Sequence, residues 1–151
     1  MAETIRQAYI RRSPKSAELY PRVKELFPSG GGGHDGYVAS PFPLSIASGK
    51  GPRKWDVDGN EYVDYFGGHG ALLLGHSHPE VIAAAHAALD AGSHFGAGHQ
   101  HELRWAQIVQ RLLPGAERVR FTSAGTEATH LALRLARAHT GRNKILRLKG
   151  H

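Results

Sequence analysis

A turn made of small, hydroxyl and glycine residues occupies positions 123–126, which read Ser-Ala-Gly-Thr. It follows a strand-like segment at residues 119–122 and precedes residues with helical apolar spacing. The first turn of a helix leaves backbone N–H groups unpaired and carries a partial positive charge, which suits a phosphate. Gly125 lets the backbone approach a ligand closely, and the hydroxyls of Ser123 and Thr126 can donate hydrogen bonds. The turn therefore predicts a phosphate site.

The same turn has an interpretation that needs no ligand. Ser and Thr are favoured at helix N-caps, because their side-chain oxygen accepts a hydrogen bond from a backbone N–H of the first turn. Either Ser123 or Thr126 would serve as such a cap. From the spacing alone, both interpretations stay open.

Two histidine pairs have a spacing that can hold a metal ion, namely His76 with His78 and His99 with His101. Both pairs lie at expected helix ends, and neither has a third ligand at a metalloenzyme spacing. We therefore expect capping, turn and surface roles and no metal site.

An acidic turn at residues 56–60 resembles the start of a calcium-binding loop. The downstream glycine and bidentate glutamate of such a loop are missing, so a hairpin turn is the better interpretation. In that hairpin, Gly59 supplies the positive φ.

Apolar residues at helical spacing predict the helices that position these turns. The first prediction covers residues 16–27, with a start near Tyr20 because Pro21 should fall in the first turn. Three more helices are expected: from Pro79 to a cap at Gly92, over residues 101–113, and from residue 128 to Gly141.

Short strands are expected between Pro43 and Tyr65, and again at residues 119–122 and 145–148. The last two would flank the helix that ends at Gly141, forming a right-handed crossover unit. Such elements indicate part of a layered α/β fold. Gly30 to Gly33 form a loop without an assigned role.

Composition narrows the classes of protein. The chain has 151 residues, of which 40% are hydrophobic and 21% charged, as in chains that fold, and its length alone predicts one domain. With no cysteine, a disulfide scaffold, a thiolate zinc site and a cysteine nucleophile are excluded. The sequence has neither a membrane-spanning stretch nor the apolar core of a secretory signal. We expect a soluble, cytoplasmic protein.

The net charge of +6 is unevenly distributed, with +5 over residues 1–54, −6 over residues 55–117 and +7 over residues 118–151. A basic terminal block can bind nucleic acid. This block lacks the interleaved aromatic residues of a single-strand binder, and a different anion is favoured.

Several stretches resemble the class III, pyridoxal-5′-phosphate-dependent aminotransferases, and especially the glutamate-1-semialdehyde 2,1-aminomutase group. They are residues 55–65 (WDVDGNEYVDY), 74–79 (LGHSHP), 120–129 (RFTSAGTEAT), 133–137 (LRLAR) and 140–142 (TGR). Together they cover roughly residues 40–151 in the order and spacing of the family. Residues 41–44 (PFPL) also resemble relatives that act on β-amino acids.

This resemblance implies an α/β fold, the N-terminal part of a fold-type I PLP-dependent transferase. That part comprises a small-domain β meander and the start of a large domain with a mixed or parallel sheet. Residues 1–75 would form the N-terminal arm and the small-domain segment. Residues 76–151 would begin the large PLP-binding domain, which is truncated.

The resemblance also assigns site residues. Gly125 and Thr126 would bind the cofactor phosphate through backbone N–H groups and the threonine hydroxyl, with Ala124 and Ser123 beside them. The family usually has serine where this chain has Ala124, so one hydroxyl is lost, and Ser123 would compensate. The aminomutases have an active-site Ser-Trp pair where this chain has Gly68-His69, which favours a general aminotransferase. His69 would then face the substrate or have a structural role.

By the same resemblance, the parent enzyme transfers an amino group between a small-molecule donor and an oxo acceptor, and is a homodimer. Its Schiff-base lysine lies downstream, and none of the six lysines here matches that position. We therefore expect an inactive N-terminal fragment without catalytic residues. Three alternatives stay open: the aminomutase of tetrapyrrole synthesis, a non-catalytic anion-binding module and a basic nucleic-acid-binding domain.

Overall fold

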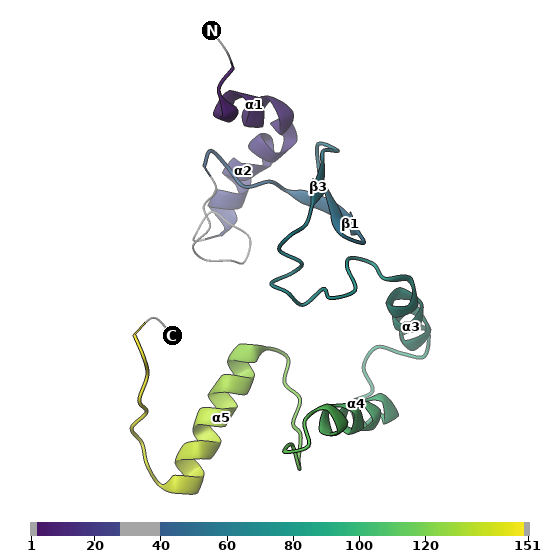
Figure 1. Cartoon of the computed structure of the whole chain (residues 1–151), viewed down its shortest axis with the longest axis vertical. Helices are drawn as coiled ribbons and strands as arrows, with labels where there is room; N and C mark the ends of the chain where they lie inside the picture. The colour runs from purple at the N-terminus through teal and green to yellow at the C-terminus, as the bar shows by residue number, and fades with distance from the viewer. Residues whose placement is uncertain (1–2, 28–39, 150–151) are drawn as a thin grey trace. The chain divides into compact units, whose positions relative to one another are not determined.

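A computed structural model describes residues 3–27 and 40–149 of the chain (Figure 1). The glycine run from Gly30 to Gly33 lies outside these residues. The chain divides into two compact units, Met1–Ser93 and His94–His151, and each is treated by itself below. The division expected at residues 75 and 76 concerns the domains of a longer protein and stays a prediction. None of the described helices is long and apolar enough to cross a membrane.

The first unit begins with two helices, α1 (Ile5–Arg12) and α2 (Pro14–Leu26). The sequence analysis did not predict α1, although Thr4 and Gln7 form a capping box at its start. The predicted start of α2 near Tyr20 is wrong. Pro14 is the first helical residue, where its fixed φ is favourable, and Pro21 lies inside the helix without ending it.

Three short strands follow, β1 (Ile46–Lys50), β2 (Arg53–Asp56) and β3 (Glu61–Val63). They form an antiparallel sheet in the order β1-β2-β3, which confirms the predicted meander.

The predicted hairpin turn between β2 and β3 is also confirmed, with Gly59 at a φ of 86°. The Asp56 carboxylate accepts hydrogen bonds from the backbone N–H groups of Asp58 (3.0 Å) and Asn60 (2.8 Å), and from the Tyr62 hydroxyl (2.8 Å). Burial raises the pKa of Asp56, but the hydrogen bonds from Asn60 and Tyr62 outweigh it, and the pKa lies below its ordinary value. The Asp56 carboxylate therefore stabilises the turn through its hydrogen bonds.

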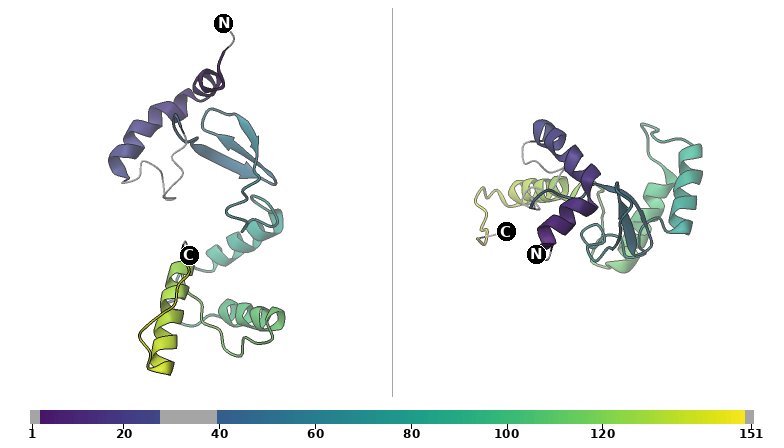
Figure 2. Two further views of the ribbon diagram at one scale, coloured as in Figure 1. Left: turned by 60° about the vertical axis from the view of Figure 1, so that its left-hand side comes forward. Right: turned by 90° about the horizontal axis from the view of Figure 1, so that it is seen from above.

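The hairpin holds the N-terminal helices through polar contacts. Asp58 accepts hydrogen bonds from the backbone N–H groups of Lys15 (2.8 Å) and Ser16 (3.2 Å), at the start of α2. The Tyr9 hydroxyl of α1 donates to the carbonyl of Phe42 at 2.7 Å, and Phe42 is buried. Figure 2 shows α1 and α2 beside the sheet.

Helix α3 (Pro79–Asp90) starts and ends as the sequence predicts. Pro79 is its first residue, and Gly92 follows its end at a φ of 126°. Its apolar stripe, which includes Val81 and Leu89, is exposed in this chain.

The second unit contains α4 (Gln100–Leu112) and α5 (Gly125–Thr140), close to their predicted bounds. Gly141 ends α5 at a φ of 67°. The strands predicted at residues 119–122 and 145–148 are wrong, because neither segment forms a strand in the described part of the chain. A strand needs hydrogen bonds to a neighbour, and the described residues supply neither segment with one. The predicted crossover unit is thus represented only by its helix.

Candidate functional site

The turn at residues 123–126 leads directly into α5. The N-cap of this helix is Ala124, and no side chain caps it. The ligand-free interpretation is therefore wrong in its detail, since Ser123 precedes the cap and Thr126 is the second helical residue.

A glutamate holds the turn in shape. The Glu127 carboxylate accepts a hydrogen bond from the backbone N–H of Ser123 at 2.9 Å. The Thr122 hydroxyl donates to the carbonyl of Ala124 at 3.2 Å. The first contact spans the cap residue and the second ends on it, so both stabilise the turn.

The start of α5 offers donors of the type that bind phosphate. The first intrahelical hydrogen bond runs from the Ala128 N–H to the Ala124 carbonyl at 3.1 Å. The N–H groups of Gly125, Thr126 and Glu127 precede it and have no acceptor within the helix. A methyl group built at Gly125 would meet no described atom within 4 Å, so the approach is open. These donors and the Thr126 hydroxyl fit a phosphate group.

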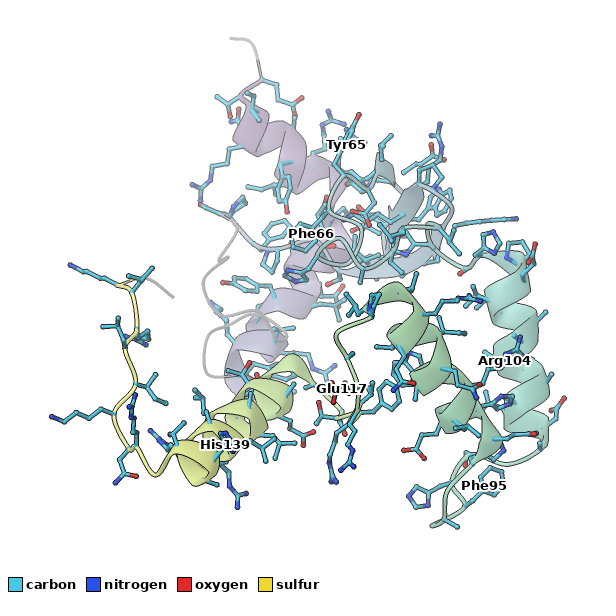
Figure 3. The ribbon with its side chains drawn as sticks, turned by 60° about the horizontal axis from the view of Figure 1, so that its bottom comes forward. Tyr65, Phe66, Phe95, Arg104, Glu117 and His139 are labelled. Carbon is cyan, nitrogen blue, oxygen red and sulfur yellow. The ribbon has the colours of Figure 1, made fainter. Side chains whose placement is uncertain are left out.

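A second feature, in the first unit, is a glycine-rich loop at residues 66–75. It starts at Phe66, shortly after the end of β3, and Phe66 and the preceding Tyr65 are labelled in Figure 3. Within it, the Gly70 N–H donates to the Phe66 carbonyl at 3.1 Å, and the Leu72 N–H donates to the Gly67 carbonyl at 3.0 Å. The loop is therefore a hydrogen-bonded turn.

Four successive residues of this turn have positive φ values: Gly67 (51°), Gly68 (58°), His69 (59°) and Gly70 (81°). Glycine adopts this conformation freely, whereas for a residue with a Cβ it costs roughly 1–2 kcal/mol. The ring of His69 packs edge-on against that of Phe66, with the centroids 4.2 Å apart. A side chain kept in such a conformation points to a functional role for His69.

Asp64 anchors the beginning of this loop. Its side chain is 5% exposed and accepts hydrogen bonds from Lys54 Nζ (3.1 Å) and the Phe66 N–H (3.1 Å). Its other oxygen lies 2.7 Å from Nε2 of His76. The hydrogen bonds from His76 and Lys54 hold the pKa of Asp64 well below its usual range. Asp64 is thus a carboxylate that stays ionised.

His76 anchors the end of the loop. Its backbone pairs with Gly51 through two hydrogen bonds of 2.8 Å each. Its ring lies so close to Gly49 that a Cβ at that position would come within 2.6 Å of the ring carbon Cγ. Asp64, His76 and the leucines that precede His76 line a pocket of about 330 Å³.

The expected helix-end roles of the histidine pairs are found only in part, because His76 pairs with Gly51 and contacts Asp64, and the His78 side chain makes no capping bond. His78 is the N-cap residue of α3, and His99 caps α4 by accepting the His101 N–H on Nδ1 at 3.2 Å. Across the described residues, no group of three metal-binding side chains comes together.

The four predicted phosphate-site residues form one turn in the second unit, whereas His69 belongs to the first unit. The sequence analysis missed Asp64. A signal was available, because Asp64 ends a strand-like segment and directly precedes a glycine-rich stretch.

The chain is similar in sequence to a known protein family. A protein-family model described as "Aminotransferase class-III" matches residues 37–151. The curated glutamate-1-semialdehyde 2,1-aminomutase of Syntrophomonas wolfei is 44% identical over 148 residues, covering 92% of this chain and 33% of the relative. That of Desulfitobacterium hafniense is 46% identical over 138 residues, covering 85% and 32%. The chain spans about a third of the length of the curated relatives it matches.

Solved structures with a similar fold include transaminases. The β-phenylalanine aminotransferase of Variovorax paradoxus has a TM-score of 0.84 and 33% identity, covering 91% of this chain and 32% of that one. The omega-transaminase of Sphaerobacter thermophilus has a TM-score of 0.83 and 34% identity, covering 90% and 31%. A glutamate-1-semialdehyde aminomutase from Pseudomonas aeruginosa has a TM-score of 0.76 and 24% identity, covering 91% and 30%, and this similarity bears on the fold alone.

Proposed function

The chain belongs to the class III aminotransferase family, and from this premise we propose that it is the N-terminal part of a PLP-dependent enzyme that transfers amino groups between small molecules. Its fold is that of the N-terminal part of fold-type I PLP-dependent transferases. The observation that carries the proposal is the start of α5, where unpaired N–H groups and a threonine hydroxyl meet in the segment matched by the family. Without a side-chain cap, these donors remain available to a phosphate.

The residues of this turn have separate roles in the proposal. The N–H groups of Gly125 and Thr126 and the Thr126 hydroxyl hold the phosphate. Ala124 and Ser123 form the turn that leads into the helix beside it. Glu127 accepts a hydrogen bond from the Ser123 N–H and so stabilises the turn. When bound, PLP supplies an electron sink for the bond changes at the amino-bearing carbon. The chain itself supplies binding and orientation, and the lysine that reacts with the cofactor comes from elsewhere in the full-length protein.

We place His69 on the substrate side of the parent enzyme. Its left-handed backbone and its contact with Phe66 fix the direction of the imidazole, which can donate or accept a hydrogen bond. The parent enzyme is further proposed to be a homodimer, and this chain alone to be inactive.

Amino transfer to a separate oxo acceptor is the activity that we favour. Solved structures named as transaminases share 26–41% identity with this chain. Isomerisation of glutamate-1-semialdehyde is the second candidate, because the curated relatives at 44–46% identity carry the aminomutase name.

The two activities differ in their need for an acceptor. The full-length enzyme is incubated with β-phenylalanine, the donor in the name of one structural relative, with and without 2-oxoglutarate, and separately with glutamate-1-semialdehyde. Acceptor-dependent formation of glutamate supports aminotransfer. Conversion of the semialdehyde to 5-aminolevulinate without an acceptor contradicts it and supports the isomerase. Inactivity in every assay contradicts both.

A further inference from the structure

The contacts of Asp64 reach both ends of the glycine-rich loop at residues 66–75. One carboxylate oxygen binds the Phe66 N–H at the entry, and the other faces the His76 ring directly after the exit. Lys54 on β2 binds the same carboxylate, so the sheet is the third attachment. The Asp64 side chain therefore links the entry of the loop to its exit, where the backbone pairing of His76 with Gly51 also holds the chain.

Backbone hydrogen bonds hold the loop's internal shape, such as those from Gly70 to Phe66 and from Leu72 to Gly67. Gly67, Gly68 and Gly70 have no side chains, and glycine loses more conformational freedom on ordering than any other residue. The two leucines before Gly75, Leu73 and Leu74, are exposed and provide no buried packing within this chain. The place of the turn relative to the sheet thus depends on its two anchored ends.

We propose that Asp64 is a positioning residue, which touches no substrate and sets the place of His69 by fixing both ends of the glycine-rich loop. The proposal rests on the substrate-side role proposed for His69. A carboxylate is suited to this task because its two oxygens accept several hydrogen bonds at once, from partners on three separate segments. Residues that orient a binding group in this way act on affinity through small displacements of that group.

The neighbouring hairpin offers a matched control. Glu61 on β3 forms an ion pair with Arg53 of β2, as Asp64 does with Lys54 of the same strand. The Glu61 side chain is 43% exposed and makes no described contact with the loop. Glu61→Gln therefore removes a carboxylate from the same sheet without releasing either end of the loop.

The test uses the full-length enzyme with Asp64→Asn, Asp64→Glu, Glu61→Gln and His69→Ala, assayed with β-phenylalanine and 2-oxoglutarate. We expect Asp64→Asn to raise KM for β-phenylalanine about tenfold while kcat changes less than about threefold. Asp64→Glu should recover most of the affinity, and Glu61→Gln should match the wild type. Hydrogen exchange should become faster in the peptide over residues 66–75 of Asp64→Asn and stay unchanged over residues 46–56.

The double variant Asp64→Asn/His69→Ala tests whether one residue acts through the other. If it does, removing the Asp64 charge adds no further increase in KM once the His69 ring is gone. Independent, multiplicative effects of the two substitutions overturn the proposal. So does a wild-type KM in Asp64→Asn, or faster exchange throughout residues 46–56, which indicates a general loss of folding.

Failure of the proposed function is distinguishable from failure of this inference. A wild-type enzyme inactive with both substrates contradicts the aminotransferase and with it the substrate role of the loop. An active enzyme whose KM is unaffected by His69→Ala contradicts the substrate role of His69 and, because the proposal acts through that ring, the positioning role as well. Unchanged exchange in Asp64→Asn overturns the anchoring of the loop irrespective of activity.

Discussion

Asp58 and Ser16 lie 42 positions apart, and the Asp58 carboxylate accepts hydrogen bonds from the Ser16 N–H at 3.2 Å and from its hydroxyl at 3.3 Å. Ser13, the N-cap residue of α2, makes no side-chain capping bond. The hairpin turn therefore caps a helix that is distant in sequence. Ser16 is 1% exposed, and its bonds to Asp58 are partly buried.

Replacing Asp58 by Ala should lower the free energy of unfolding by about 0.5–2 kcal/mol, the usual cost of losing a helix cap. Asp58→Asn should lie between the wild type and Asp58→Ala, because asparagine keeps one of the two acceptor oxygens that bind Lys15 and Ser16. Urea unfolding followed by circular dichroism measures both. Equal unfolding midpoints for Asp58→Ala and the wild type would show that the contact contributes nothing.

Lowering the pH should release the glycine-rich loop in a defined window. The pKa of Asp64 is lowered in the folded chain by His76 and Lys54, so its stabilising contribution is complete above the unfolded value of about 3.9. That contribution is lost as the pH falls below this value toward the folded pKa. The difference in urea midpoint between wild type and Asp64→Asn should thus be constant from about pH 5 to 8 and shrink below about pH 4. A difference that disappears between about pH 5 and 7 would assign the effect to a histidine instead.

Two substitutions of His69 separate backbone strain from ring contact. Both His69→Gly and His69→Ala lose the packing on Phe66, but only glycine relieves the left-handed backbone at 59°. We expect the glycine variant to be more stable than the alanine variant by about 1 kcal/mol. Both should raise KM for the amino donor in the full-length enzyme. Equal stability of the two variants would show that the left-handed backbone conformation of His69 costs no free energy.

The 151-residue chain alone should not form a covalent adduct with PLP. We propose that none of its six lysines is the lysine that reacts with the cofactor, so the isolated chain should show no absorption band near about 410–430 nm after incubation with PLP and dialysis. Borohydride treatment and mass spectrometry then test each lysine. A retained band that traps the cofactor on one lysine would contradict the inactivity of the fragment.

Local patterns predicted the local elements of this fold. The hairpin at Gly59, the start of α3 at Pro79 and the end of α5 at Gly141 each depend on the conformational preferences of one or two residues. The start of α2 was placed wrongly because Pro14 and Pro21 give competing signals, and the deciding contact with Asp58 is distant in sequence.

The errors share a physical origin. The segments at residues 119–122 and 145–148 have strand-like composition, but strand formation depends on a pairing partner that composition does not reveal. The turn at residues 123–126 was predicted to be a phosphate site from its residue types, and this stays a prediction, while its cap at Ala124 was not predicted. The anchoring of the loop by Asp64 joins residues 54, 64 and 76, and such a tertiary contact leaves only a weak local signal.

Cofactor retention by Thr126→Ala in the full-length protein tests the central claim most directly. Thr140→Ala is the matched control, because Thr140 is a threonine of the same helix whose hydroxyl bonds to the Ala136 carbonyl at the opposite end. PLP retained after dialysis is measured for both variants and the wild type. We predict that Thr140→Ala keeps its cofactor like the wild type, whereas Thr126→Ala loses PLP at least about tenfold more readily, equivalent to a charge-assisted hydrogen bond to phosphate. Equal retention by all three proteins would contradict the phosphate role of the turn at the start of α5.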